Sequence, residues 1–257
     1  MKKIQIIILL LTVFQLSAQQ KKATIVYGMP LDTIASLVKK HPKYFAHLQK
    51  KASDFTKKMS QDEWIMLYYG SAFMPNFHPK KEEKAVEQVA HKMAELDFSG
   101  AIKDAENLIK VYPVNARLYM LTGYAYKKIG EKEKSKKYYK RYANILRIPL
   151  YSGSGKDFTH AFVVRSTGDE YLILNNKNLD LVQQELRYHN EQPYDVMLVT
   201  NKIKNNQKLS SLHKSKLYFN IYLPFFIGEH RTYKEKQEEA KRKYHYKPNT
   251  AIYKKKK

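Results

Sequence analysis

Few residues of this chain have the types and spacing that a catalytic or ligand-binding site requires. The first candidate is a short glycine-rich segment. A glycine-rich loop that ends in lysine can hold phosphate groups with its backbone N–H groups. In the segment Gly153–Asp157 the pattern would need a glycine at Leu150 and a serine or threonine at Asp157, and it has neither. The segment therefore supplies no phosphate cradle and no Mg²⁺ ligand.

Two pairs of neighbouring acids are the next candidates, because paired carboxyl groups can act as general acid and base. Asp62 and Glu63 follow Ser60 in the pattern of a capping box, which begins a helix. Asp169 and Glu170 follow a threonine and a glycine, a composition typical of a hairpin turn. These structural roles explain both pairs.

Other catalytic and metal-binding patterns are missing from the sequence. It contains no Gly-x-Ser-x-Gly nucleophile elbow, and none of its nine histidines forms a His-x-x-x-His pair. It also contains no cysteine, which excludes disulfides and a lipoprotein anchor on an acylated cysteine. We therefore predict no catalytic residue, no cofactor and no metal site.

Aromatic residues are the strongest candidates for contact with a partner. Phe73–Pro79 is an aromatic-rich segment in which two prolines exclude a helix. One interpretation is a packed turn, with Tyr68 and Phe73 buried against the next hairpin. The other is an exposed rim that offers side chains to a peptide or glycan. With two tyrosines of the following hairpins, the candidate interaction residues are Tyr69, Phe77, His78, Tyr119 and Tyr126.

The elements that would position these side chains are helical over residues 30–148, where apolar residues recur at helical spacing. Two successive units of 34 residues, beginning at Glu82 and Ala116, resemble the tetratricopeptide repeat. The aromatic, small, glycine and proline positions of that pattern are occupied by Phe98, Ala101, Pro113, Tyr119, Gly123, Tyr126, Gly130 and Tyr139. Val89, Ser135 and Tyr142 depart from it. Two amphipathic hairpins with coincidental spacing are the alternative.

Residues 149–228 predict a small α+β unit after the helices. The pattern favours a short helix that carries Leu179, Val182 and Leu186. Strands are predicted, with a hairpin turn between the first two, over residues 160–165, 170–174, 196–200 and 217–223. The predicted fold class is therefore α+β: tetratricopeptide-like hairpins followed by a small, mostly antiparallel sheet with one packed helix.

The N-terminal residues have the pattern of a secretory signal peptide. Lys2 and Lys3 precede an apolar run over residues 4–16, and Ala18 supplies the small residue of a cleavage site. A bilayer takes about 20 apolar residues to span, so the run is too short for a comfortable anchor. We expect residues 1–18 to be removed and the protein to be periplasmic or extracellular, with no transmembrane segment afterwards.

The chain is strongly basic, with a formal net charge of +23. An exported protein is not expected to meet nucleic acid. One interpretation of the excess is a solvated, soluble surface, and the other is attraction to an anionic partner such as lipid phosphates, an envelope polysaccharide or an acidic protein. Residues 229–257 form a basic tail, which we expect to be mobile. The candidate polyanion contacts in this tail are Lys241, Arg242, Lys243, Lys254, Lys255, Lys256 and Lys257.

Several short motifs occur in the order found in a known family. They are Leu67–Gly70, Phe73-x-Pro75-x-Phe77-x-Pro79, Gly153-x-Gly155 before Ala161–Phe162, Asp169–Tyr171, Tyr194–Asp195 and Tyr218–Ile221. Together they resemble a domain-of-unknown-function family of exported Bacteroidetes proteins, over roughly residues 40–223. The resemblance implies a compartment and a fold type, and it implies no catalytic or binding residues.

Three functional hypotheses remain open. The leading one is an exported, non-enzymatic protein-interaction module whose helical hairpins present a groove to a protein or peptide. The first alternative is an envelope-associated polyanion-binding protein that uses the tail and the basic residues 202–216. The second alternative is an enzyme of an unrecognised class. High salt should abolish binding in the polyanion case and only weaken it in the leading one.

Overall fold

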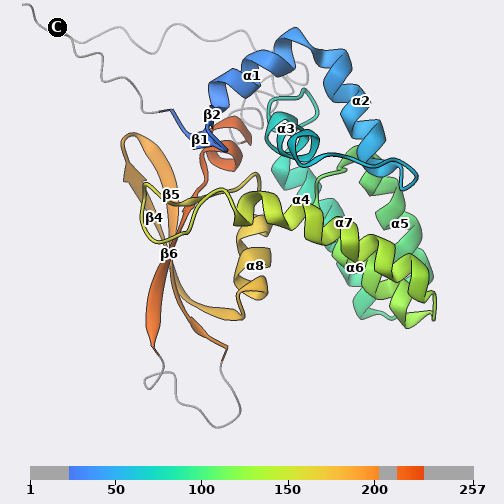
Figure 1. The fold of residues 1–257 in the computed structure, drawn as a ribbon. Coiled ribbons are helices and arrows are strands. Elements are labelled where there is room, and N and C mark those ends of the chain that lie inside the picture. Colours follow the sequence, from blue (N-terminus) through green and yellow to red (C-terminus); the bar gives the residue numbers. More distant parts are fainter. Residues whose placement is uncertain (1–22, 203–212, 229–257) are drawn as a thin grey trace, which may run out of the picture.

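A computed structural model describes residues 23–202 and 213–228 (Figure 1). The predicted signal peptide, most of the basic segment 202–216 and the basic tail lie outside the described residues. The fold is α+β, as the sequence predicts: a helical part precedes a small sheet, and both contribute to one continuous hydrophobic core. Among the described residues, none of the helices combines the length and the apolar composition that crossing a membrane requires.

The chain enters the helical part through a two-stranded antiparallel hairpin. The hairpin and the first helices are β1 (Ile25–Val26), β2 (Met29–Pro30), α1 (Leu31–Lys40), α2 (Pro42–Ser53) and α3 (Gln61–Ser71). The predicted capping box begins α3, because Glu63 N–H donates to Ser60 Oγ at 3.2 Å and Ser60 N–H donates to Glu63 Oε2 at 2.8 Å.

The predicted helical hairpins follow, and each helix packs on the next. They are α4 (Pro79–Ala94), α5 (Phe98–Val111), α6 (Ala116–Lys128) and α7 (Lys132–Leu150). Gly123 lies where α6 contacts α7, since a Cβ built on it would be 3.2 Å from the Tyr139 ring. The small residue therefore has the role that the 34-residue pattern predicts, which is to let two helices approach closely.

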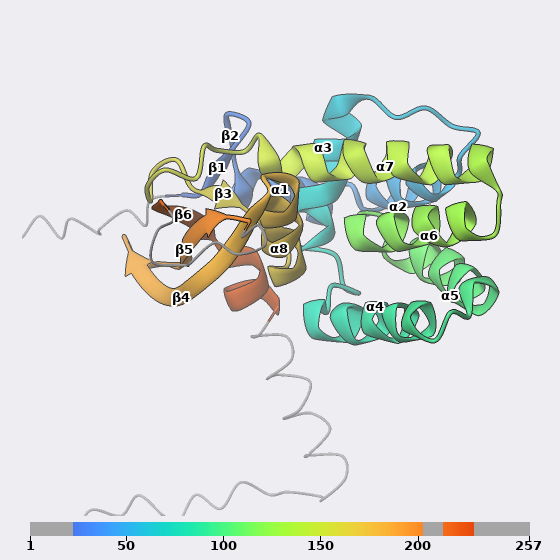
Figure 2. The same cartoon turned by 90° about the horizontal axis from the view of Figure 1, so that it is seen from below.

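The sheet has four strands in the order β3-β6-β5-β4, with β3 parallel to β6 and the other pairs antiparallel. Its elements are β3 (Phe162–Val163), β4 (Leu179–His189), β5 (Gln192–Asn201) and β6 (Lys214–Asn220), followed by the π-helix η2 (Leu223–Gly228). Helix α8 (Thr167–Asn176) precedes β4. Figures 1 and 2 show α8 between the sheet and the helical hairpins, where it contacts α6, α7 and β4.

Three sequence predictions in this part are wrong. Residues 170–174 belong to helix α8 and not to a strand, and residues 167–169 are its first turn and not a hairpin turn. The error arose because Leu172, Ile173 and Leu174 are all buried. A short apolar run of this kind has no periodicity that separates a buried helix from a buried strand.

The segment with Leu179, Val182 and Leu186 is strand β4 and not a helix. The strand pairs shift register between Leu181 and Gln183, so Val182 is the extra residue of a β-bulge. The bulge breaks the alternation of a strand and leaves apolar residues at helix-like spacing. A tight turn joins β4 to β5, and its central residues Asn190 and Glu191 have φ values of 48° and 60°. The usual Asn-Gly signal for such a turn is absent.

The Gly123→Leu variant should be less stable than the wild type by about 1–3 kcal/mol, because the larger side chain forces α6 away from Tyr139. The measurement is urea unfolding of both proteins. Lys127→Leu is the matched control, since it adds leucine to the exposed face of the same helix. Equal stability of Gly123→Leu and the wild type would contradict close packing at this position.

Candidate functional site

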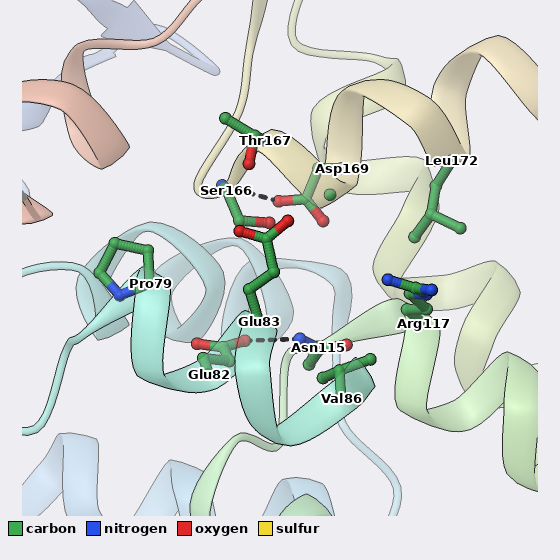
Figure 3. A pocket seen from close by; sticks show the side chains of 11 residues that line it. Pro79, Glu82, Glu83, Val86, Asn115, Arg117, Ser166, Thr167, Asp169 and Leu172 are labelled. Atoms are coloured by element: carbon green, nitrogen blue, oxygen red, sulfur yellow. Dashed lines mark hydrogen bonds between the residues drawn. The ribbon is translucent and has the colours of Figure 1, made fainter. Parts of the chain in front are cut away.

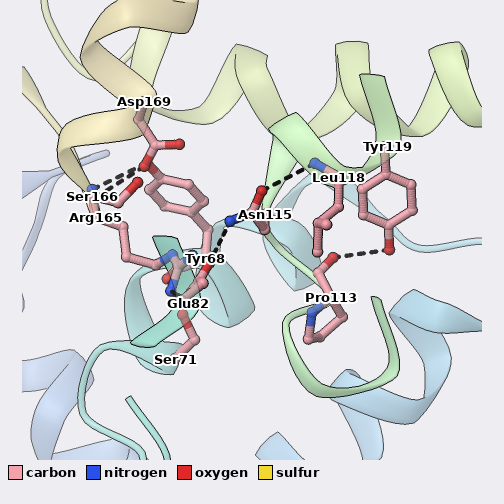
Figure 4. A network of polar contacts seen from close by, with 10 residues as sticks. All are labelled: Tyr68, Ser71, Glu82, Pro113, Asn115, Leu118, Tyr119, Arg165, Ser166 and Asp169. Atoms are coloured by element: carbon pink, nitrogen blue, oxygen red, sulfur yellow. Dashed lines mark hydrogen bonds and ion pairs between the residues drawn. The ribbon is translucent and has the colours of Figure 1, made fainter. Parts of the chain in front are cut away.

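A buried ion pair lies where the helical part meets the sheet. Arg165, just after β3, donates from Nη1 to Glu82 Oε2 of α4 at 3.0 Å, and its Nη2 also contacts Glu82 Oε1 (Figure 4). The two side chains are 3% and 2% exposed. A charge in such a site is costly unless an opposite charge is paired with it, so each residue depends on the other. The pair therefore connects α4 to the end of β3.

The same network holds the beginning of α8 against α3. Tyr68 of α3 donates its hydroxyl proton to Asp169 Oδ2 at 2.7 Å, and Ser166 N–H donates to the same oxygen at 3.0 Å. The Tyr68 oxygen in turn accepts from Arg165 N–H at 3.2 Å. Burial raises the pKa of Tyr68 well above its usual value, and the Asp169 carboxylate raises it further. Tyr68 is therefore a neutral donor that fixes the carboxyl group of Asp169.

Asn115 extends the network to the helical hairpins. Its Nδ2 donates to Glu82 Oε1 at 2.7 Å, while its Oδ1 accepts from Leu118 N–H at 3.1 Å and so caps α6 (Figure 4). One amide group thus fixes the start of α6 relative to α4. Together the contacts of Asn115, Glu82, Arg165, Tyr68 and Asp169 join α3, α4, α6, β3 and α8 through polar side chains.

A cleft lies beside this network, and we call it the junction cleft. Its space, which includes a part open to solvent, is about 410 Å³. Its walls come from α4, the start of α6 and the first turns of α8 (Figure 3). Its apolar surface comes from Pro79, Val86 and Leu172, and its polar lining residues are Glu82, Glu83, Asn115, Arg117, Ser166, Thr167 and Asp169. The cleft is lined by three acids and one arginine, so its charge is opposite in sign to the net charge of +23 of the chain.

Glu83 differs from the other acids of the junction cleft. It is exposed, and its carboxylate points toward Ser166 and Thr167 at the start of α8 (Figure 3). Glu82 and Asp169 are committed to Arg165, Tyr68 and the backbone of Ser166. Glu83 has no hydrogen-bond or ionic partner within residues 23–202 and 213–228. It is therefore the acid that can meet a ligand.

A second acidic feature lies on the sheet side of α8. Both carboxyl oxygens of Glu170 are buried, and no hydrogen-bond donor of the described residues reaches them. Burial, and then the neighbouring Asp195 carboxyl group, raise the pKa of Glu170 well above its usual value. Asp195 itself accepts a hydrogen bond from Gln184 Nε2 at 2.7 Å. Two carboxyl groups this close retain one proton at a pH where exposed carboxyl groups have lost theirs.

The structure corrects the list of candidate interaction residues. Tyr69, Phe77, Tyr119 and Tyr126 are all buried, and His78 is half-buried. The tyrosine hydroxyl groups bond inside the protein: Tyr69 to the Val163 carbonyl, Tyr119 to the Pro113 carbonyl and Tyr126 to Glu106. Because packing of the helices covers these rings, they do not form a rim for a partner. The lysines and arginine proposed as polyanion contacts lie outside the described residues.

The acid pair Asp169 and Glu170 also has a different role from the predicted one. The two residues lie in the first turn of α8 and are buried, whereas the sequence favoured a hairpin turn. Of the two residues of the ion pair, Arg165 could have been noticed in the sequence, since it is a charged residue at the end of the apolar run 161–164. Glu82 has no such signal, because it lies among the lysines and glutamate of residues 80–84.

The glycine-rich segment has a structural explanation. Gly155 has a φ of 72°, and a Cβ on it would collide with the Phe162 ring, while a Cβ on Gly153 would collide with the Ala161 backbone. The glycines therefore let this segment lie against β3. No three His, Cys, Asp or Glu side chains are grouped closely enough to hold a metal ion in the described part of the chain. The junction cleft is therefore a partly acidic surface whose walls are held by the buried network.

Comparison with known proteins gives one match. A family model described as Domain of unknown function (DUF4919) matches residues 33–246. No curated protein and no solved structure matches the chain. The family match confirms the domain-of-unknown-function part of the resemblance found in the sequence motifs.

The Glu170→Gln variant tests the shared proton. The unfolded chain releases the Glu170 proton near the ordinary pKa of 4.5, whereas the folded protein keeps it to a higher pH. The contribution of Glu170 to stability is therefore fully present at acidic pH and is lost as the pH rises through the folded-state pKa. Relative to Glu170→Gln, the melting temperature of the wild type should fall as the pH rises above the ordinary carboxyl range, because the folded-state pKa of Glu170 is raised.

The expected change is several degrees, since ~1 kcal/mol corresponds to ~2–4 °C in a chain of this size. Glu87→Gln on the exposed face of α4 is the control and should follow the wild type at every pH. If the wild type and Glu170→Gln give parallel profiles, Glu170 ionises like an exposed carboxyl group.

Proposed function

The chain belongs to the DUF4919 family of domains of unknown function, and we propose that it is an exported, non-enzymatic protein-interaction module. In this proposal the junction cleft receives a segment of a partner protein. The observation that carries it is the construction of the cleft: three elements distant in sequence form its walls, and a buried ion pair fixes them.

Rigidity supports a binding role. A site whose walls are already fixed loses little conformational entropy when a ligand enters, so more of the contact energy contributes to affinity. Glu82, Asn115 and Asp169 each line the cleft and also belong to the buried network. The shape of the cleft therefore depends on contacts that are shielded from water. Pockets with apolar walls and a few convergent polar groups are the usual form of binding sites.

The lining indicates what kind of segment fits. Glu83 offers an exposed carboxylate to a lysine or arginine side chain, and Val86 and Leu172 offer apolar surface beside it. Arg117 lies on the Leu172 side of the cleft, away from the carboxylate of Glu83 (Figure 3). It can donate to a backbone carbonyl or carboxylate of the same segment. The expected partner segment thus carries one basic side chain next to an apolar one.

Export and the absence of catalysis rest on the sequence. The positive N-terminus, apolar run and Ala18 support export. The missing nucleophile, metal and phosphate motifs support a binding role rather than catalysis. A contribution of the basic tail to attachment at an anionic surface is compatible with this proposal, and it is separated from cleft binding in the experiment below.

Charge reversal in the junction cleft tests the proposal. The bait proteins are the wild type, Glu83→Lys and the matched control Glu87→Lys, which makes the same change one turn further along α4. After crosslinked capture from the native cell envelope, a partner should be recovered with the wild type and Glu87→Lys but not with Glu83→Lys. With the captured partner purified, Glu83→Lys should weaken binding by about tenfold or more, since like charges in an interface repel.

Two results would contradict the proposal. Equal capture of the same proteins by Glu83→Lys and the wild type would exclude the junction cleft as the binding surface. The polyanion hypothesis would be favoured if no protein is captured and all three proteins are retained equally on anionic vesicles. In that case the retention should disappear at high salt and on truncation after His230.

A further inference from the structure

A second cleft lies beside the β4–β5 turn and the end of β6, and we call it the amide cleft. Its space, which includes a part open to solvent, is about 690 Å³. One wall is the start of the described chain, and the others come from the loop before β3, the β4–β5 turn and the end of β6. The lining residues that define its chemistry are Thr24, Phe158, His189, Gln192, Tyr194 and Asn220.

The lining of the amide cleft is uncharged apart from histidine. Charged residues make up 28% of the chain, yet no lysine, arginine, aspartate or glutamate of the described residues lines this cleft. Its polar groups are hydroxyls and side-chain amides. Such a lining offers no ionic attraction to a charged ligand, and it can both donate and accept hydrogen bonds. A neutral ligand rich in hydrogen-bonding groups fits this chemistry.

The floor of the amide cleft is built from buried amides in fixed positions. Gln192 and Asn220 are 5% and 3% exposed. Asn220 Nδ2 donates to Gln192 Oε1 at 2.8 Å, and the Thr24 hydroxyl donates to the same oxygen. The Asn220 Oδ1 accepts from Tyr222 N–H at 3.0 Å, which leaves a second lone pair for a ligand. The Thr24 Oγ1 atom accepts a long hydrogen bond from Asn220 Nδ2 at 3.4 Å, which leaves its second lone pair for a ligand.

One side of the amide cleft is a wall of aromatic rings. Phe158 stacks on His189 with the ring centroids 4.7 Å apart and the planes at 11°, and Tyr194 meets the edge of Phe158 at 5.1 Å. His189 is exposed, so the stacked pair reaches the mouth of the cleft. Rings of this kind pack against apolar C–H surface while nearby polar groups bond to hydroxyls.

We propose that the amide cleft binds an uncharged saccharide. The sugar hydroxyls bond to Thr24 and Asn220 on the floor, and a C–H face of a sugar ring packs against the wall formed by Phe158 and His189. This assignment is independent of the junction cleft, which lies on different elements and has charged walls.

The neighbouring strand edge argues against an extended peptide as the ligand. A peptide that adds to a sheet needs free backbone groups along the edge. Beside the cleft, Val163 N–H already donates to Ser152 Oγ at 2.8 Å, and the His160 carbonyl accepts from the backbone of Ser154 and Gly155. Side-chain groups therefore remain as the main hydrogen-bonding surface, and they suit hydroxyls.

Direct binding measurements test the proposal. The full chain is titrated with glucose, N-acetylglucosamine and their uncharged oligomers by calorimetry, after a screen on an array that also carries acidic glycans. An uncharged saccharide should bind with an affinity that does not change between low and high salt, because no ion pair contributes. His189→Ala should weaken binding by about tenfold, through loss of ring contact.

Tyr188→Ala is the matched control, since it removes an exposed ring from the adjacent position of β4, which faces the opposite side of the strand. It should bind as the wild type does. The proposal is overturned if the array retains acidic glycans only, if peptides bind and saccharides do not, or if no uncharged saccharide binds. Binding that His189→Ala and Tyr188→Ala weaken equally would also place the ligand elsewhere.

Discussion

The pairing of Arg165 with Glu82 is the constraint on which the junction of the helical part and the sheet depends. Each residue is buried, so each would be an uncompensated charge without the other. Arg165 follows β3 and Glu82 lies in the first turn of α4, 83 residues earlier in the chain. Their contact therefore fixes how the sheet lies against the helical hairpins. Hydrogen bonds of Tyr68 and Asn115 to the same pair further restrict this arrangement.

The two clefts follow from this arrangement in different ways. The junction cleft lies directly on the network and shares Glu82, Asn115 and Asp169 with it, so its charge and shape are coupled to the ion pair. The amide cleft lies where Thr24 contacts the start of β5 and the end of β6, and buried amides rather than charges hold its floor. One fold thus presents a partly acidic surface and a neutral surface.

The sequence predicts the helical part well because its signals are local. Ser60 and Glu63 begin α3, proline begins α2 and α4, and the small Gly123 lies at a helix contact. The candidate site could not be predicted in the same way, because Glu82 and Arg165 meet only after the chain has folded. In the sheet, the β4–β5 hairpin could not be predicted from the sequence, because the bulge at Val182 breaks the strand pattern and the turn at Asn190 and Glu191 lacks the usual residues. The buried tyrosines show that aromatic residues in a sequence do not by themselves predict an exposed surface.

A double-mutant cycle on the ion pair tests the account most directly. The free energy of unfolding is measured for the wild type, Glu82→Leu, Arg165→Met and the double variant. Each single change should cost about 3–5 kcal/mol, because it leaves one buried charge unpaired. The double variant should lose much less than the sum, with a coupling of ~2 kcal/mol or more. Losses that simply add would show that Glu82 and Arg165 act independently, and that the junction is held by other contacts.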